Sequence, residues 1–162
     1  MTINLKNFLN TKPKLSKMGE FQELKPIDGL EISSFSADLY KNGRDDLALF
    51  YFKDGANYSA MYTSNSIVSQ TIEWNKKSNK SFTKALLVNT KNANTFTGDQ
   101  GVEGVDLVAK NLSRILTLRE SKSDQGVSET VKMKELIFAS TGVIGEKFPA
   151  ENIVTSLQPL VD

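Results

Sequence analysis

The 162-residue sequence contains no histidine and no cysteine. Without cysteine the chain cannot form disulfides, and without either residue it cannot build the usual structural zinc sites. A Ser–His–Asp triad or a Cys–His pair made from this chain alone is also excluded. If the chain belongs to an enzyme, its proton transfers must use carboxylates, lysine, tyrosine, a terminal amine or residues of another chain. One nucleophile needs no histidine, namely an N-terminal threonine whose own α-amine acts as the base.

Long apolar runs and an excess of one charge are also missing. No apolar run reaches the roughly 20 residues that a membrane span needs, and residues 1–20 lack the hydrophobic segment of a secretory signal. Twenty Lys and Arg against nineteen Asp and Glu leave a formal charge of +1. This balance gives no electrostatic reason to expect nucleic acid or a membrane as partner. With no disulfide framework, we expect a cytoplasmic protein.

Length and composition favour one globular domain. Hydrophobic residues make up 39% of the chain and charged residues 24%, which is ordinary for a soluble protein with a substantial core. Residues 1–27 are polar and show no clear period, so we expect an N-terminal arm followed by a domain over 28–162. Short apolar strands mixed with amphipathic helix predict an α/β fold, a layered sandwich of sheets and helices.

Several short segments have the patterns of strands, which are alternating or continuously apolar over four to eight residues. The candidates are EISSFSADLY (31–40), LALFYF (47–52), KALLVNT (84–90) and ELIFAS (135–140). Lys53-Asp54-Gly55 is expected to end the second strand, which makes residues 58–65 its predicted antiparallel partner. Segment 66–77 has a mixed pattern that supports no assignment.

The strongest helix signal lies in residues 102–119. Apolar residues recur there on one face of a helix about 17 residues long, at Val105, Val108, Ala109, Leu112, Ile115 and Leu116. Residues 120–130 are expected to form a loop, and Pro149 predicts the start of a second helix. Asp45 and Asp46, in a polar turn, are expected to lie on a solvated corner.

Two loops that follow buried strands are candidates for a functional site, because sites in α/β folds gather where strands end. NTKNANTFTG (89–98) is rich in Asn and Thr, but it also suits a capped turn in which Thr97 and Gln100 form a capping box. STGVIG (140–145) can present a hydroxyl and bare N–H groups to the negative oxygen of a tetrahedral acyl-transfer intermediate. The local sequence by itself favours a strand cap in which Gly142 supplies a positive φ. The local sequence leaves both interpretations open for each loop.

Three segments, taken in order, resemble successive signature blocks of the glutamate N-acetyltransferase family, also called ornithine acetyltransferase. They are GRDDLALF (43–50), LLVNTKNANTFTGDQG (86–101) and ASTGVIGEKFPAENI (139–153). The resemblance runs from about residue 28 to the C-terminus, and STGVIG followed by a proline is its most specific block. The chain departs from the family where Thr90-Lys91 replaces the usual Ser-Gly and where Phe96 replaces a small residue.

The resemblance implies the α chain of a precursor that cuts itself before an internal threonine. The new N-terminal Thr of the β chain would take acetyl from N2-acetyl-L-ornithine as an ester and pass it to L-glutamate, in arginine biosynthesis. Thr141 and Gly142 match the family's oxyanion hole by position. The family further implies no cofactor and no metal, with acetyl-CoA as an alternative acetyl donor in some members. It also implies a heterotetramer of two α and two β chains, with most substrate-binding residues beyond Asp162.

Two other functions stay open at this point. A related self-processing aminopeptidase or amidohydrolase would share the N-terminal Thr chemistry but pass the acyl group to water. A non-catalytic binding module would keep the fold without a catalytic partner chain. The product formed in the presence of glutamate distinguishes the transferase from the aminopeptidase or amidohydrolase. A second chain that begins with Thr distinguishes it from the binding module.

Overall fold

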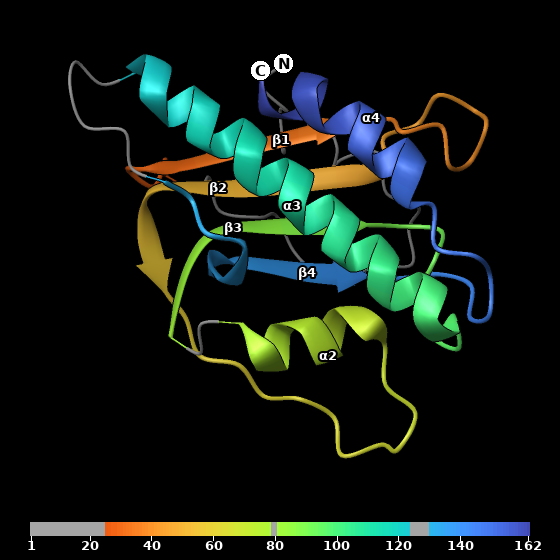
Figure 1. Ribbon diagram of the computed structural model, residues 1–162. Coiled ribbons are helices and arrows are strands. Elements are labelled where there is room, and N and C mark those ends of the chain that lie inside the picture. Colours follow the sequence, from red (N-terminus) through yellow and green to blue (C-terminus); the bar gives the residue numbers. More distant parts are fainter. Residues whose placement is uncertain (1–24, 79–80, 124–129) are drawn as a thin grey trace.

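The computed structural model describes residues 25–78, 81–123 and 130–162, in which helices lie against a four-stranded sheet (Figure 1). In spatial order the strands are β1 (Leu30–Phe35), β2 (Leu47–Asn57), β3 (Phe82–Asn89) and β4 (Leu136–Ser140). The helices are α2 (Gln70–Lys77), α3 (Gly98–Ser123) and α4 (Ala150–Val161), and a 3-10 turn, η1 (Met133–Glu135), precedes β4. The predicted α/β class is therefore confirmed.

The parallel direction of β3 and β4 places the loops that follow them at the same end of the sheet. β1 pairs with β2 and β2 with β3 in antiparallel fashion, whereas β3 and β4 are parallel. The long helix α3 provides the crossover that a parallel pair requires. Asn89 is the register partner of Ser140, so the carboxyl ends of β3 and β4 meet at the same end of the sheet.

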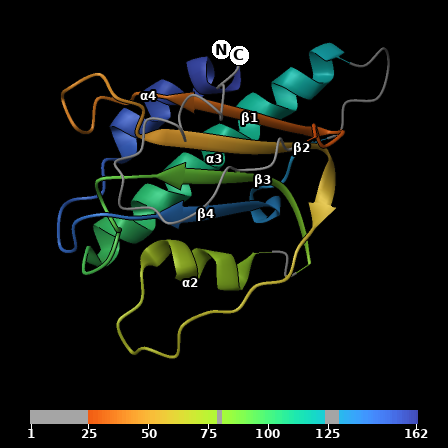
Figure 2. The same cartoon turned by 180° about the vertical axis from the view of Figure 1, so that it is seen from behind.

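The core lies between one face of the sheet and helices α3 and α4. Strand side chains alternate: Leu47, Leu49 and Tyr51 are buried under the helices, whereas the residues between them are only partly buried. All six apolar residues of the predicted α3 face are buried, and burying each large one stabilises the fold by about 1.5–3 kcal/mol. Seen from behind, none of the three helices covers the opposite face of the sheet (Figure 2).

Helix α2 covers the outer edge of β4. The side-chain amide of Asn75 donates to the carbonyl of Phe138 at 2.8 Å and accepts from its N–H at 2.9 Å, as a neighbouring strand would. The indole of Trp74 donates to Leu136 O at 3.2 Å and packs edge-on against the Phe138 ring. A covered edge cannot pair with another chain, and α2 is thereby fixed beside β4.

Three assignments from the sequence need correction. Residues 58–65 form no strand, because β2 continues through a bulge after Tyr51 and pairs with β3 instead. The first strand ends at Phe35, and Asp38 then takes a left-handed φ of 56°. Helix α3 continues through Ser123, so the predicted loop begins too early; its remainder in 124–129 lies outside the described residues.

The other assignments agree with the structure, except that α3 begins at Gly98 rather than at residue 102. β3, β4 and the start of α4 match their predicted segments within two residues, and residues 47–52 lie within β2. The unassigned segment 66–77 contains α2, capped by Ser69. The predicted arm lies outside the described residues except for 25–27. No helix in the described part of the chain combines the length and the apolar character required to cross a bilayer.

Candidate functional site

The two candidate loops lie side by side beyond β3 and β4. Thr141 N–H donates to Asn89 O at 3.0 Å, and Ala93 N–H donates to Val143 O at 3.0 Å. Farther along, Gly145 N–H donates to Thr95 O at 2.8 Å. The loops therefore extend the parallel strand pairing past the sheet, and residues that are about 50 positions apart form one surface.

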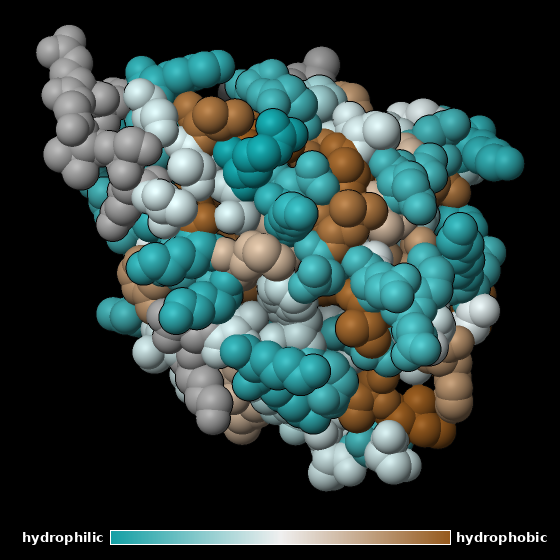
Figure 3. Space-filling model, viewed as in Figure 1, coloured by the Kyte–Doolittle hydropathy of each residue, from teal (hydrophilic) through white to brown (hydrophobic). Residues whose placement is uncertain are grey.

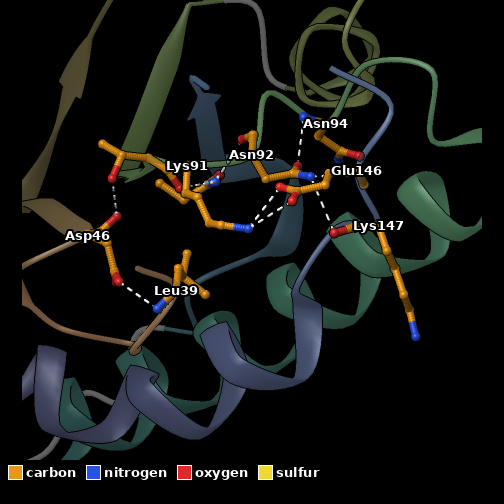
Figure 4. A network of polar contacts seen from close by, with 9 residues as sticks. Leu39, Asp46, Lys91, Asn92, Asn94, Glu146 and Lys147 are labelled. Carbon is orange, nitrogen blue, oxygen red and sulfur yellow. Dashed lines mark hydrogen bonds and ion pairs between the residues drawn. The ribbon is translucent and has the colours of Figure 1, made fainter. Parts of the chain in front are cut away.

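Two buried asparagines, Asn89 and Asn92, hold this pair of loops together, and a third, Asn94, bonds within the first loop. Asn92, which is 1% exposed, donates from its side-chain amide to the carbonyls of Glu146 and Lys147, at 2.7 and 3.2 Å (Figure 4). Its Oδ1 accepts from Asn94 N–H at 2.8 Å. The Asn89 side chain accepts from the Ser140 hydroxyl at 2.6 Å. Because an unpaired buried amide is costly, these contacts specify one loop arrangement.

The predicted capping box does not form. The Thr97 hydroxyl donates to Asn94 Oδ1 at 2.7 Å. The Gln100 side chain instead bonds both backbone groups of Phe148, donating at 2.8 Å and accepting at 3.0 Å. A residue close in space but distant in sequence has taken the place of the local partner, and α3 is tied to the segment that leads into α4.

Asp46 is also wrongly predicted, since it is 2% exposed and does not lie on a solvated corner. Its carboxylate accepts from the N–H groups of Ala37 and Leu39 at 2.7 and 2.8 Å. Its carbonyl accepts from Thr90 N–H at 2.9 Å. Asp46 thus connects the segment between β1 and β2 to Thr90, the first residue after β3. No local pattern in the sequence marks this role.

Thr141 and Gly142 lie at the exposed tip of the second loop. The Thr141 hydroxyl has no hydrogen-bond partner among the described residues, and neither has the Gly142 N–H. Gly142 has a φ of +133°, as the strand-cap interpretation expects. A hydroxyl and an N–H on adjacent residues of a supported turn are the donors that an oxyanion needs. The two interpretations of this loop are therefore compatible.

Exposed apolar side chains lie on the same two loops as these donors. Val143, Ile144 and Phe96 are 53%, 60% and 66% exposed. The helix-covered side of the molecule shows a mixture of polar and apolar side chains (Figure 3). No group of His, Cys, Asp and Glu in the described ranges is arranged to hold a metal ion. The chemistry that this site offers is donation of hydrogen bonds.

Fold and site together define a mixed α/β protein with hydrogen-bond donors presented where two parallel strands end. The model of the ArgJ family matches residues 31–162, and the chain belongs to this family. The family resemblance found in the three sequence blocks is thus confirmed.

Individual relatives agree with this assignment. The chain is 31% identical over 136 residues to the arginine biosynthesis bifunctional protein ArgJ of Gluconobacter oxydans, and 31% identical over 129 residues to that of Caulobacter vibrioides. These matches cover 83% and 77% of this chain but 29% of each relative. The chain therefore spans less than a third of the length of these relatives.

Two solved structures share the fold. ArgJ of Bacillus halodurans superposes with a TM-score of 0.68 at 21% identity, covering 81% of this chain and 62% of that one. Ornithine acetyltransferase of Mycobacterium tuberculosis, solved in complex with ornithine, gives 0.73 at 20% identity, covering 83% and 66%. At this identity the likeness establishes the mixed α/β fold.

Proposed function

We propose that this chain is the α chain of a glutamate N-acetyltransferase, which moves acetyl from N2-acetyl-L-ornithine to L-glutamate in arginine biosynthesis. The observation that carries the proposal is the exposed Thr141-Gly142 turn. In a chain of the ArgJ family, it offers a hydroxyl and an N–H without partners among the described residues. We assign these two groups as the oxyanion hole. One such donor contributes about 10²–10³ in kcat.

The first half of the reaction would form an acetyl ester. The N-terminal threonine hydroxyl of the β chain attacks the acetyl carbonyl carbon, and its proton passes to the threonine α-amine. As the new C–O bond forms, the carbonyl oxygen gains a negative charge, to which Thr141 Oγ1 and Gly142 N donate. Collapse of this intermediate breaks the amide C–N bond, and the proton moves to the departing amine of ornithine.

The second half would reverse these steps with a different amine. The amino group of glutamate attacks the ester carbonyl, which generates the oxyanion again in the same place. The C–O bond to threonine then breaks, the threonine oxygen regains a proton, and N-acetylglutamate is released. The same two donors serve both halves, so their loss is expected to slow acylation and deacylation alike.

The proposal includes a β chain from the same precursor, in a heterotetramer of two α and two β chains. Exposed apolar side chains on the same pair of loops, Val143, Ile144 and Phe96, support a macromolecular contact at this place, because exposed apolar patches often mark interfaces. The sheet face that the three helices leave uncovered offers further apolar surface, including Ile32 at 56% exposure. Acetyl-CoA is retained as an alternative donor, and the proposed location is the cytoplasm.

Intact mass and N-terminal sequencing of the chains that co-purify from the native gene test the architecture. The expected result is a second chain that begins with Thr. Incubation with N-acetylornithine, with and without glutamate, tests the reaction. Acetylglutamate formed only with glutamate supports the transferase, whereas free acetate formed at the same rate in both samples supports the amidohydrolase. A single chain without acyl transfer would leave the binding module as the better description.

A further inference from the structure

One residue holds both ends of the turn 142–146. The carbonyl of Lys91 accepts from Val143 N–H at 2.8 Å, near the start of the turn. The ammonium of Lys91 lies 3.0 and 2.9 Å from the two carboxylate oxygens of Glu146, at its end (Figure 4). The residue that carries the proposed N–H donor, Gly142, lies next to the first of these contacts.

The ion pair does little for stability. The side chains of Lys91 and Glu146 are 34% and 45% exposed, and pairs this exposed contribute little because water competes for both charges. Lys91 also has a φ of +74°, a left-handed conformation that favours glycine over a residue with a side chain. The left-handed backbone of Lys91 lowers the stability of the fold, and the ion pair raises it only slightly. A contribution to stability therefore does not explain the arrangement.

We propose that Lys91 is a positioning residue for the oxyanion donors at Thr141 and Gly142, an inference that rests on the proposed function. With its carbonyl at one end and its ammonium at the other, Lys91 fixes the course of the turn and thus the direction of the Gly142 N–H. The strength of an oxyanion contact depends steeply on donor distance and direction. Loosening the turn is therefore expected to weaken transition-state binding without removing a donor.

Steady-state kinetics of the complete protein, expressed from its full gene, test this role. Lys91→Met is expected to lower kcat about two- to fivefold, with little change in the KM for N-acetylornithine. The reversed pair Lys91→Glu/Glu146→Lys is expected to regain most of the loss. Lys76→Met is the matched control, because Lys76 and Glu73 form an ion pair of the same 2.9 Å length and similar exposure on α2. A kcat for Lys91→Met equal to that of the control overturns the proposal.

Lys91→Gly separates positioning from stability. It removes the ion pair but relieves the left-handed backbone, so we expect an unchanged or higher Tm together with a lower kcat. A parallel fall of Tm and kcat would assign Lys91 a merely structural role.

Hydrogen exchange gives a readout that does not depend on activity. Amides 142–146 are expected to exchange faster in Lys91→Met than in the wild type, and equal rates overturn the positioning role. A wild-type protein without acetyl transfer would refute the proposed function, while the exchange rates would still decide whether Lys91 holds the turn.

Discussion

A Cβ atom at Gly142 would lie 2.2 Å from both the carbonyl carbon and the carbonyl oxygen of Lys91. The two residues meet because the parallel strands β3 and β4 end at the same level and their loops continue together. Gly142 also has a φ of +133°, which L side chains rarely adopt. Close approach and backbone conformation thus both require glycine at this position.

Gly142→Ala is therefore expected to destabilise the protein by about 2–4 kcal/mol, the sum of backbone strain and overpacking. Urea unfolding of the complete protein measures this change. Gly43→Ala is the control, because Gly43 has a φ of +71° but no atom within 4 Å of its added Cβ. It should lose only about 1–2 kcal/mol. Equal losses in the two variants would show that the contact with Lys91 can relax.

Thr141→Ala is expected to lower kcat by about one to three orders of magnitude, because it removes one hydroxyl donor from the proposed oxyanion hole. Thr141→Ser keeps the hydroxyl and should retain most of the activity. The measurement is the rate at which the β chain is acetylated in a single turnover, followed by mass spectrometry. An unchanged acetylation rate in the folded Thr141→Ala variant would leave the Gly142 N–H as the donor and exclude the Thr141 hydroxyl.

Val108→Asp tests the buried face of α3. Val108 is 1% exposed, so an aspartate there would bury an unpaired charge, and we expect a loss of about 3–5 kcal/mol. Leu107→Asp is the adjacent control, at a position that is 40% exposed, and should change stability little. Thermal unfolding followed by circular dichroism compares the two. Similar melting temperatures would contradict the packing of α3 against the sheet.

The pKa of Tyr51 gives a prediction for alkaline pH. Its hydroxyl donates to Glu120 Oε1 at 2.5 Å, at the end of the sheet opposite the site. Burial, then the hydrogen bond to Glu120 and the charge of Glu120, raise the pKa of Tyr51 above the ordinary value of 10.0. The native state therefore binds this proton more tightly than the unfolded chain does. The contribution of Tyr51 to the free energy of unfolding is therefore complete below about pH 10 and is lost as the pH rises further.

Urea midpoints at pH 8, 10 and 11 check this expectation. The free energy of unfolding should decline above about pH 10, and the decline should be shallower in Tyr51→Phe, which has no phenol proton to lose. Identical pH dependence in the two proteins would show that Tyr51 does not contribute.

The helix α3 and the strands β3 and β4 could be predicted from the sequence because they depend on local geometry. A helix repeats its faces every 3.6 residues and a strand every two, so the buried positions from Val105 to Leu116 follow from spacing alone. The positive φ of Gly142 was likewise foreseeable, since few other residues tolerate that conformation in a turn. The family could be recognised because each of its signature blocks is a continuous stretch of the sequence.

Partners distant in the sequence could not be predicted in this way. Nothing near Gln100 indicates that Phe148 will replace a local capping partner, and nothing near Asn92 names Glu146 and Lys147. The pairing of β2 with β3 rather than with residues 58–65 likewise joins segments that are distant in the sequence.

The sequence by itself thus determined the fold class, the helix that covers the sheet, the family and the two candidate loops. Only the tertiary structure decided that these loops lie together, that Lys91 and Asn92 bond to residues 143–147, and that Asp46 bonds to Thr90. The physical reason is that periodicity and turn chemistry act over a few residues. The partner of a buried polar group, in contrast, is set by which strand ends the sheet order brings to the same place.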